Sequence, residues 1–106
     1  GKQKRDFLYI EDAVSAILKA LINKTARGEV INIGSGRVIT LLSLMKTIKK
    51  KIGGGKILLG RIKLRKDEPM IIAPNLSRSR KILKWQSTTS LKQGINKTIK
   101  FYKRII

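Results

Sequence analysis

The stretch of sequence that decides the fold reads Arg5-Asp6-Phe7-Leu8-Tyr9-Ile10-Glu11-Asp12-Ala13-Val14. Residues 7–10 are aromatic or aliphatic, which is typical of a short, partly buried strand. Glu11 and Asp12 follow where a helix would begin, and carboxylates there accept free backbone N–H groups and suit the positive end of the helix dipole. The stretch therefore predicts a strand that leads directly into a helix.

The predicted helix is apolar around much of its circumference. One stripe has the i, i+3, i+4, i+7 spacing of a helical face and consists of Val14, Ile17, Leu18 and Leu21. Beside this stripe lie three alanines, Ala13, Ala16 and Ala20. A helix of this kind is normally covered on two sides, so we expect a homodimer or a separate chain segment to provide the second cover.

Length and composition limit the possible functions. The 106 residues are enough for a single domain, residues 1–106, with a small core. Cysteine and histidine are both absent, which excludes disulfides, cysteine chemistry and histidine-based acid–base or zinc sites. There is no apolar run long enough to span a membrane and no secretory signal, so the sequence predicts a cytoplasmic protein without a membrane partner.

The formal net charge of +19 has two explanations. A strongly basic domain would bind a polyanion such as nucleic acid. Alternatively, the charge reflects codon bias, because lysine and isoleucine are both abundant and both have AT-rich codons. The lysines are spread along the predicted helices, and aromatic residues that could stack on bases are few. We therefore favour codon bias over a nucleic-acid partner.

Two further strands are predicted, each followed by a turn or loop. Residues 29–33 and residues 56–64 have the apolar, β-rich composition of strands. The sequence Gly34-Ser35-Gly36 is interpreted as a tight turn, because a dinucleotide-binding loop needs a third glycine and usually a later acidic residue. Asp67 and Glu68 lie in a loop before a proline, and adjacent side chains of an extended loop point apart. We therefore give little weight to a catalytic carboxylate pair there.

Three further helices are predicted from their capping residues. Thr40 is a favourable N-cap for a helix whose buried stripe would be Leu41, Leu44, Met45, Ile48 and Ile52. Asn75 can cap a short helix that ends near Leu83. Ser90 and Gln93 form a capping box for a last helix with an apolar face of Leu91, Ile95, Thr98, Ile99 and Tyr102.

These motifs, in this order, resemble the extended short-chain dehydrogenase/reductase family, which includes nucleotide-sugar epimerases, dehydratases and decarboxylases. The opening stretch resembles the family's Arg-Asp-Phe-hydrophobic-Tyr-hydrophobic-x-Asp motif. The other similar segments are Val30-Ile31-Asn32-Ile33-Gly34-Ser35-Gly36, Asn75-Leu76-Ser77-Arg78-Ser79, Leu83-Lys84-Trp85 and Ser90-Leu91-Lys92-Gln93-Gly94-Ile95. Asn75 replaces the family's Asp, and Lys84 replaces its Gly. In the family these segments belong to the C-terminal, sugar-nucleotide-binding half.

The resemblance implies an α/β fold with about four helices and a few short strands, like the C-terminal substrate-binding part of a Rossmann-type epimerase or dehydratase. It also implies that Arg5 and Arg65 contact the pyrophosphate of a nucleotide sugar, because both stand where the family has phosphate-binding arginines. Guanidinium groups suit this role because they bind phosphate oxygens through paired, charge-assisted hydrogen bonds. The alternative for each residue is a solvated surface arginine.

The family's catalytic machinery has no counterpart in this sequence. Its glycine-rich cofactor turn is missing, and so is its Tyr-x-x-x-Lys proton relay, since Tyr9 is followed four residues later by Ala13. Intact family members use NAD or NADP, and for this chain we expect no cofactor, no turnover and at most weak nucleotide-sugar binding. The expected partner is a separate N-terminal cofactor-domain half or a second copy. Two other readings are a basic nucleic-acid-binding module and a structural interaction domain without a ligand.

Overall fold

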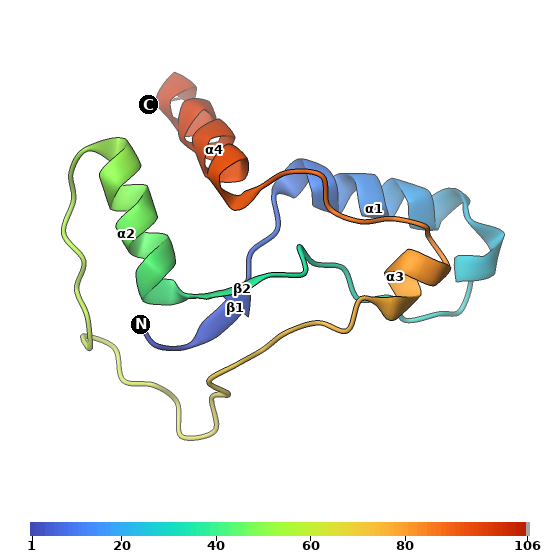
Figure 1. Cartoon of the computed structure of the whole chain (residues 1–106), viewed down its shortest axis with the longest axis horizontal. Coiled ribbons are helices and arrows are strands. Elements are labelled where there is room, and N and C mark those ends of the chain that lie inside the picture. Colours follow the sequence, from blue (N-terminus) through green and yellow to red (C-terminus); the bar gives the residue numbers. More distant parts are fainter. Residues whose placement is uncertain (106) are drawn as a thin grey trace.

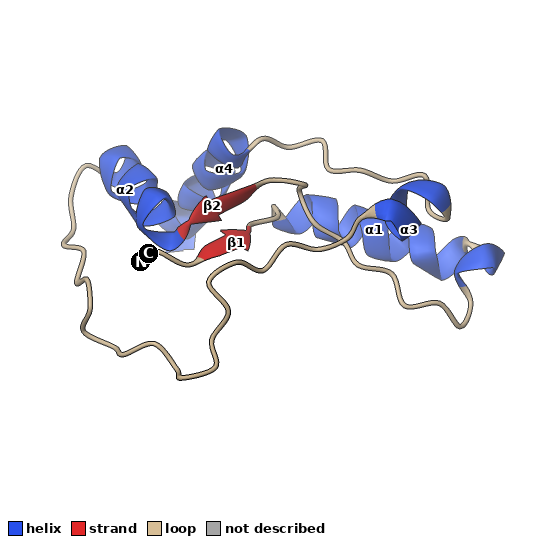
Figure 2. Cartoon of the chain, turned by 60° about the horizontal axis from the view of Figure 1, so that its bottom comes forward, coloured by secondary structure: helices blue, strands red, loops and turns tan. Residues whose placement is uncertain are grey.

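The computed structural model describes residues 1–105, which form four α-helices and one small sheet (Figures 1 and 2). In chain order the elements are β1 (Lys4–Asp6), α1 (Ile10–Ile22), the 3₁₀ helix η1 (Lys24–Ala26), β2 (Val38–Thr40), α2 (Leu41–Ile52), α3 (Ser77–Lys81) and α4 (Leu91–Ile105). A long loop joins α2 to α3 along the edge of the molecule (Figure 1). The expectation of an α/β fold with about four helices and short strands is confirmed.

The sheet is shifted from the predicted position. β1 and β2 pair antiparallel along all three residues of each strand. On its other side, β1 forms an isolated parallel bridge between Lys4 and Ile71. The strand predicted at residues 7–10 is therefore wrong, because the hydrogen-bonding partners lie beside β1 and α1 already begins at Ile10. The second strand of the sheet, β2, was not predicted.

Neither of the other predicted strands forms. Residues 29–33 and residues 56–64 have no strand paired with them in the described part of the chain, and a strand needs such a neighbour for its backbone hydrogen bonds. Several of their apolar side chains are open to solvent, with 77% of Val30 and 91% of Ile62 exposed. The apolar pattern is present in both segments, but the partner that would turn it into a strand is not among residues 1–105.

The starts of α2 and α4 follow the predicted capping chemistry. Oγ1 of Thr40 accepts the backbone N–H three residues later, at 3.1 Å. Both bonds of the capping box form at the start of α4, where the N–H of Ser90 donates to Oε1 of Gln93 at 3.0 Å and the N–H of Gln93 donates to Oγ of Ser90 at 3.2 Å. The prediction that Asn75 caps the short helix is wrong: the N-cap of α3 is Leu76, and Oδ1 of Asn75 accepts the N–H of Ser77 at 3.0 Å from one residue further out.

The buried core is small and is built on the alanine face of α1. Its centre consists of Ala16, Leu83 and Trp85. Around these residues pack the partly buried side chains of Leu8, Ala20, Ala26, Ile31, Ile33 and Ile82. The predicted stripe of α1 remains uncovered, with 61% of Ile17 and 79% of Leu21 exposed. Within this chain, α1 therefore buries its small residues and leaves its large apolar residues open.

The apolar faces of α2 and α4 line an open groove. No residue of α2 is buried, so the predicted buried stripe is wrong: Leu44 and Ile48 are half-buried and Ile52 is 55% exposed. The groove between the two helices has a volume of about 1030 Å³ and extends from Tyr9 to Phe101. In addition to the stripe of α1, the chain thus has a second exposed apolar surface.

The whole molecule is more open than a self-contained domain of its mass. It measures 47 × 39 × 19 Å, and its radius of gyration is 16.2 Å, whereas about 13 Å is typical for this length. Its accessible surface is 8520 Å², whereas a compact monomer of this mass exposes about 6,000 Å². No helix of the described residues combines the length and apolar character that crossing a membrane requires.

Asp6, the last residue of β1, fixes the tight turn predicted at residues 34–36. Its Oδ1 accepts the N–H of Ser35 at 2.8 Å, and its Oδ2 accepts the N–H of Gly36 at 2.9 Å. Gly34 allows this approach, because a Cβ there would lie 2.7 Å from Cγ of Pro74 and 2.8 Å from Oδ2 of Asp6. The amides that a phosphate-binding loop would offer are therefore already bonded to a carboxylate of the chain itself.

We predict that Gly34→Ala destabilises the chain by about 1–3 kcal/mol, because the added methyl group must push Pro74 or the bonded Asp6 carboxylate out of place. The measurement is the midpoint of urea unfolding followed by circular dichroism. Gly54→Ala is the matched control, since a Cβ at Gly54 meets no atom within 4 Å. Equal midpoints for the two variants would show that the close approach at Gly34 does not constrain the fold.

Candidate functional site

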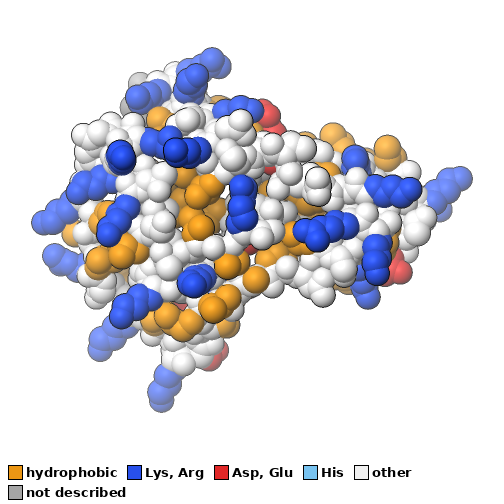
Figure 3. Space-filling model, in the orientation of Figure 1, with side chains coloured by type: hydrophobic (Ala, Val, Ile, Leu, Met, Phe, Trp, Pro, Cys, Tyr) orange, Lys and Arg blue, Asp and Glu red, His pale blue; other side chains and the backbone are white. Residues whose placement is uncertain are grey.

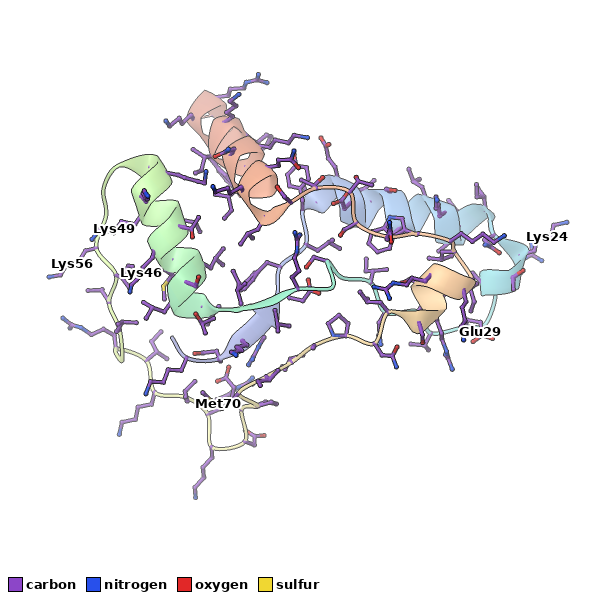
Figure 4. All side chains as sticks on the ribbon, viewed as in Figure 1. Lys24, Glu29, Lys46, Lys49, Lys56 and Met70 are labelled. Carbon is purple, nitrogen blue, oxygen red and sulfur yellow. The ribbon has the colours of Figure 1, made fainter. Side chains whose placement is uncertain are left out.

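Arg5 attaches a distant loop to β1. Its Nη2 donates to the carbonyl oxygen of Pro69 at 2.9 Å and lies 3.3 Å from Oε1 of Glu68. Its Nη1 donates to the carbonyl oxygen of Lys4 at 2.8 Å and lies 3.5 Å from that of Met70. Figure 4 labels Met70 on this loop, next to the strand. The guanidinium group therefore links the loop to β1, and 20% of the side chain remains exposed.

Arg65, the second predicted site residue, begins the turn that Arg5 holds. The carbonyl oxygen of Arg65 accepts the N–H of Glu68 at 3.1 Å. The Arg65 side chain is exposed, and no ion pair with it occurs among residues 1–105. The structure thus connects the two arginines through one turn, with Arg5 bonded to the turn and Arg65 projecting from it.

The neighbouring carboxylates do not form a catalytic pair. Glu68 is engaged by Arg5, and Asp67 is exposed. This agrees with the interpretation from sequence that charges in this basic loop are paired or solvated.

Asp12 is the only acidic residue that is buried in the described part of the chain, with 6% exposed. Its Oδ1 accepts the hydroxyl of Thr88 at 3.1 Å, and its Oδ2 accepts the backbone N–H of Thr89 at 3.0 Å. Burial alone would raise the pKa of Asp12, but the hydrogen bonds from Thr89 and Thr88 outweigh it and hold the pKa below its ordinary value of 3.8. These bonds tie the first turn of α1 to the segment that leads into α4.

The positive charge is distributed over the molecule. On the face shown in Figure 3, lysine and arginine side chains surround apolar patches and do not merge into one basic area. The lysines labelled in Figure 4 come from different elements: Lys24 from η1, Lys46 and Lys49 from α2, and Lys56 from the following loop. The choice between codon bias and a nucleic-acid surface stays a prediction.

Known proteins share the sequence and the fold of this chain. Residues 1–98 match the family described as GDP-mannose 4,6 dehydratase. The chain belongs to this family of extended short-chain dehydrogenases/reductases. Over 101 residues it is 36% identical to CDP-abequose synthase of Salmonella muenchen, covering 93% of this chain and 34% of that protein. The resemblance inferred from the motifs is confirmed.

Solved structures agree with this assignment. UDP-glucose 4-epimerase of Thermotoga maritima with UDP-glucose has a TM-score of 0.85 at 28% identity, covering 99% of this chain and 33% of that one. UDP-glucuronic acid 4-epimerase from Bacillus cereus, in complex with UDP-glucuronic acid and NAD, has a TM-score of 0.82 at 29% identity, covering 100% of this chain and 34% of that one. The chain of this dehydratase-family member spans about a third of the length of these relatives.

The described residues of this family member do not fit a dinucleotide cofactor. The turn at residues 34–36 is the segment nearest in sequence to a glycine-rich cofactor loop, and Asp6 already accepts the N–H groups of Ser35 and Gly36. An incoming pyrophosphate would meet a carboxylate there instead of free amides. We therefore assign no cofactor-binding residue to this chain.

We predict that Asp12 makes the stability of the chain depend on acid pH. Because the pKa is lower in the folded state, the carboxylate stabilises the fold above about pH 4, and this contribution is lost as the pH falls through the folded-state pKa. Asp12→Asn should cost about 1–3 kcal/mol at neutral pH, since an amide cannot accept both hydrogen bonds.

The measurement is the free energy of unfolding in urea, taken at neutral pH and at steps down to about pH 2.5. Glu11→Gln is the control, because Glu11 is an exposed carboxylate in the same helical turn. The stabilising role of the Asp12 carboxylate is refuted if Asp12→Asn is as stable as Glu11→Gln and keeps the acid dependence of the wild type.

Proposed function

We propose that this chain is the C-terminal, substrate-binding portion of a nucleotide-sugar epimerase or dehydratase, and that Arg5 and Arg65 hold the pyrophosphate of a nucleotide sugar. The observation that carries the proposal is the bonding of Arg5 to the turn that bears Arg65. These bonds hold the guanidinium group of Arg5 against the turn that begins at Arg65. The substrate class is supported by the relatives whose structures contain UDP-glucose and UDP-glucuronic acid.

The contacts of Arg5 allow it to hold the turn and a phosphate together. An arginine has five N–H donors, and the bonds of Arg5 within residues 1–105 involve Nη1 and Nη2. The contact with Glu68 is long and partly exposed, so it contributes no more than about 1 kcal/mol. A doubly charged pyrophosphate would displace Glu68, while the bond to the Pro69 carbonyl oxygen keeps the turn in place. Arg65 then supplies a second guanidinium from the exposed side.

The open apolar surfaces are the place where the rest of such an enzyme would pack. The stripe of α1 and the groove between α2 and α4 are exposed, and the chain has about 2,500 Å² more surface than a compact monomer of its mass. The partner in this proposal is a cofactor-binding half, in the same polypeptide or separately encoded. A second copy of the chain is the alternative cover, which the net charge of +19 opposes.

The division of tasks follows from the residues present. NAD or NADP, bound to the other half, would accept and return a hydride. The residues of this chain bind the substrate: Arg5 and Arg65 neutralise its diphosphate, and Arg5 keeps their turn in a fixed place against β1.

We predict that the purified 106-residue chain does not turn over nucleotide sugars. No residue set in it replaces the Tyr-x-x-x-Lys proton relay of the family. The chain is incubated with NAD and UDP- or dTDP-sugars, and the products are followed by chromatography. Turnover above that of a heat-denatured sample would contradict the proposal that the chemistry belongs to another part of the enzyme.

We predict that the chain binds UDP with a dissociation constant of about 1 mM, equivalent to about −4 kcal/mol, because the diphosphate contacts are present and most other nucleotide contacts are not. NMR chemical-shift changes induced by UDP should cluster at Arg5 and Arg65. They should fade in the Arg5→Gln/Arg65→Gln variant.

The matched control removes two positive charges elsewhere, in Arg27→Gln/Arg104→Gln, at exposed residues outside this turn. Inorganic pyrophosphate is titrated in parallel, to separate recognition of the nucleotide from attraction to any polyanion. Shifts scattered over the lysine-rich helices, and reduced equally by both double variants, would rule out a pyrophosphate site at Arg5 and Arg65.

A further inference from the structure

A polar cavity lies away from the turn of Arg5 and Arg65. Its volume is about 380 Å³, near the lower end of the range of about 300–1,000 Å³ typical of small-molecule pockets. Three parts of the chain enclose it: the turn at residues 34–37, the helix α3, and the segment 85–93 that leads into α4. No acidic residue lines it, whereas two arginines, Arg37 and Arg80, do.

Both arginine side chains are exposed and border this cavity. Nη2 of Arg37 lies 3.4 Å from the carbonyl oxygen of Thr89, a long contact that leaves most of its donors available. Nη2 of Arg80 lies over Gly36, 4.0 Å from where a Cβ of that residue would be. Arg80 has no ion pair among residues 1–105. Two guanidinium groups from separate elements therefore border the same space.

The remaining polar wall is organised by bonds within the chain. The hydroxyl of Ser87 donates to the carbonyl oxygen of Ser35 at 3.3 Å, and Oγ of Ser35 accepts the N–H of Arg37 at 3.1 Å. The nearby carboxylates of Asp6 and Asp12 do not line the cavity, and both accept hydrogen bonds from other parts of its wall. The wall is thus organised before any ligand binds, and the arginines are the only charged side chains among residues 1–105 that line it.

We infer that this cavity is a binding site for the phosphate group of a small phosphorylated molecule, a phosphate monoester, with Arg37 and Arg80 as its ligands. Guanidinium groups bind phosphate oxygens through paired, charge-assisted hydrogen bonds, which makes the phosphate the recognised group. The cavity is larger than a bare phosphate ion requires, and the oxygens of its serine and threonine hydroxyls can accept hydrogen bonds from the rest of the molecule. The inference does not depend on nucleotide-sugar binding by Arg5 and Arg65.

Trp85 provides a direct readout. It is the only tryptophan of the chain, it is 4% exposed, and it lines this cavity. Glucose 6-phosphate is therefore titrated into the 106-residue chain at constant ionic strength while the fluorescence of Trp85 is followed. Glucose and inorganic phosphate are titrated separately. We expect a saturable change with glucose 6-phosphate, a weaker one with phosphate and none with glucose.

Removal of the two charges should abolish most of the binding. In Arg37→Gln/Arg80→Gln the dissociation constant should rise about tenfold or more, since a single charge-assisted hydrogen bond accounts for roughly that factor. Arg27→Gln/Arg104→Gln removes the same net charge outside the cavity. This control should change the dissociation constant for glucose 6-phosphate by less than about twofold. Arg5→Gln/Arg65→Gln should also leave glucose 6-phosphate binding intact, which separates this site from the pyrophosphate site.

Thermal unfolding shows whether each variant is folded. Because Arg80 is exposed, Arg80→Lys provides a second test if the double variant unfolds: it keeps the charge, loses the planar fork and should weaken binding severalfold. Equal losses in the cavity variant and in the Arg27/Arg104 control would overturn the site. Equal affinity for glucose 6-phosphate and inorganic phosphate would overturn the assignment of a phosphate monoester. No fluorescence change in the wild type, with no shift at Arg37 or Arg80 by NMR, would overturn both.

Discussion

The carboxylate of Asp6 is the contact on which the arrangement of this chain depends. By accepting the N–H groups of Ser35 and Gly36, it brings the turn at residues 34–36 to the end of β1. The chain then runs back along β1 as β2 and continues into α2. The other edge of β1 receives the loop at residues 70–72, which Arg5 also bonds. Three segments far apart in sequence therefore meet at one strand of three residues.

Features set by neighbouring residues could be predicted from the sequence, and those that need a distant partner could not. The cap at Thr40, the capping box of Ser90 and Gln93, and the loop before Pro69 each depend on a few consecutive residues. A strand depends on a neighbour, and β1 is found where β2 and residue 71 lie beside it, not where the apolar pattern is strongest. The segment at residues 29–33 has the pattern and lacks the neighbour.

The features of the candidate site also separate into those that could be predicted from the sequence and those that could not. Arg5 and Arg65 could be named from their positions in family motifs, but the bonds from Arg5 to a turn more than sixty residues away could not. Asp12 was visible as an acidic residue at a helix start, which is a local role. Its partners, Thr88 and Thr89, lie 76 and 77 residues further along the chain. The available signal was the position of Asp12 near the end of the opening stretch, where the sequence resembles the Arg-Asp-Phe-hydrophobic-Tyr-hydrophobic-x-Asp motif of the family.

Hydrogen bonds and apolar surfaces contribute differently to this molecule. Hydrogen bonds from Asp6, Asp12 and Arg5 set the geometry, but each adds only about 1–3 kcal/mol, and the apolar core of Ala16, Leu83 and Trp85 is small. The stripe of α1 and the groove between α2 and α4 add little burial within residues 1–105, because both are open to solvent.

A partner that covers these apolar faces binds the folded chain only, and so raises the population in which the turn of Arg65 is in place. The apparent affinity for a ligand falls by the fraction of molecules that are in the competent state. In the function we propose, ligand binding at Arg5 and Arg65 would therefore be coupled to the covering of surfaces that the ligand never touches, because both depend on the same folded arrangement around β1.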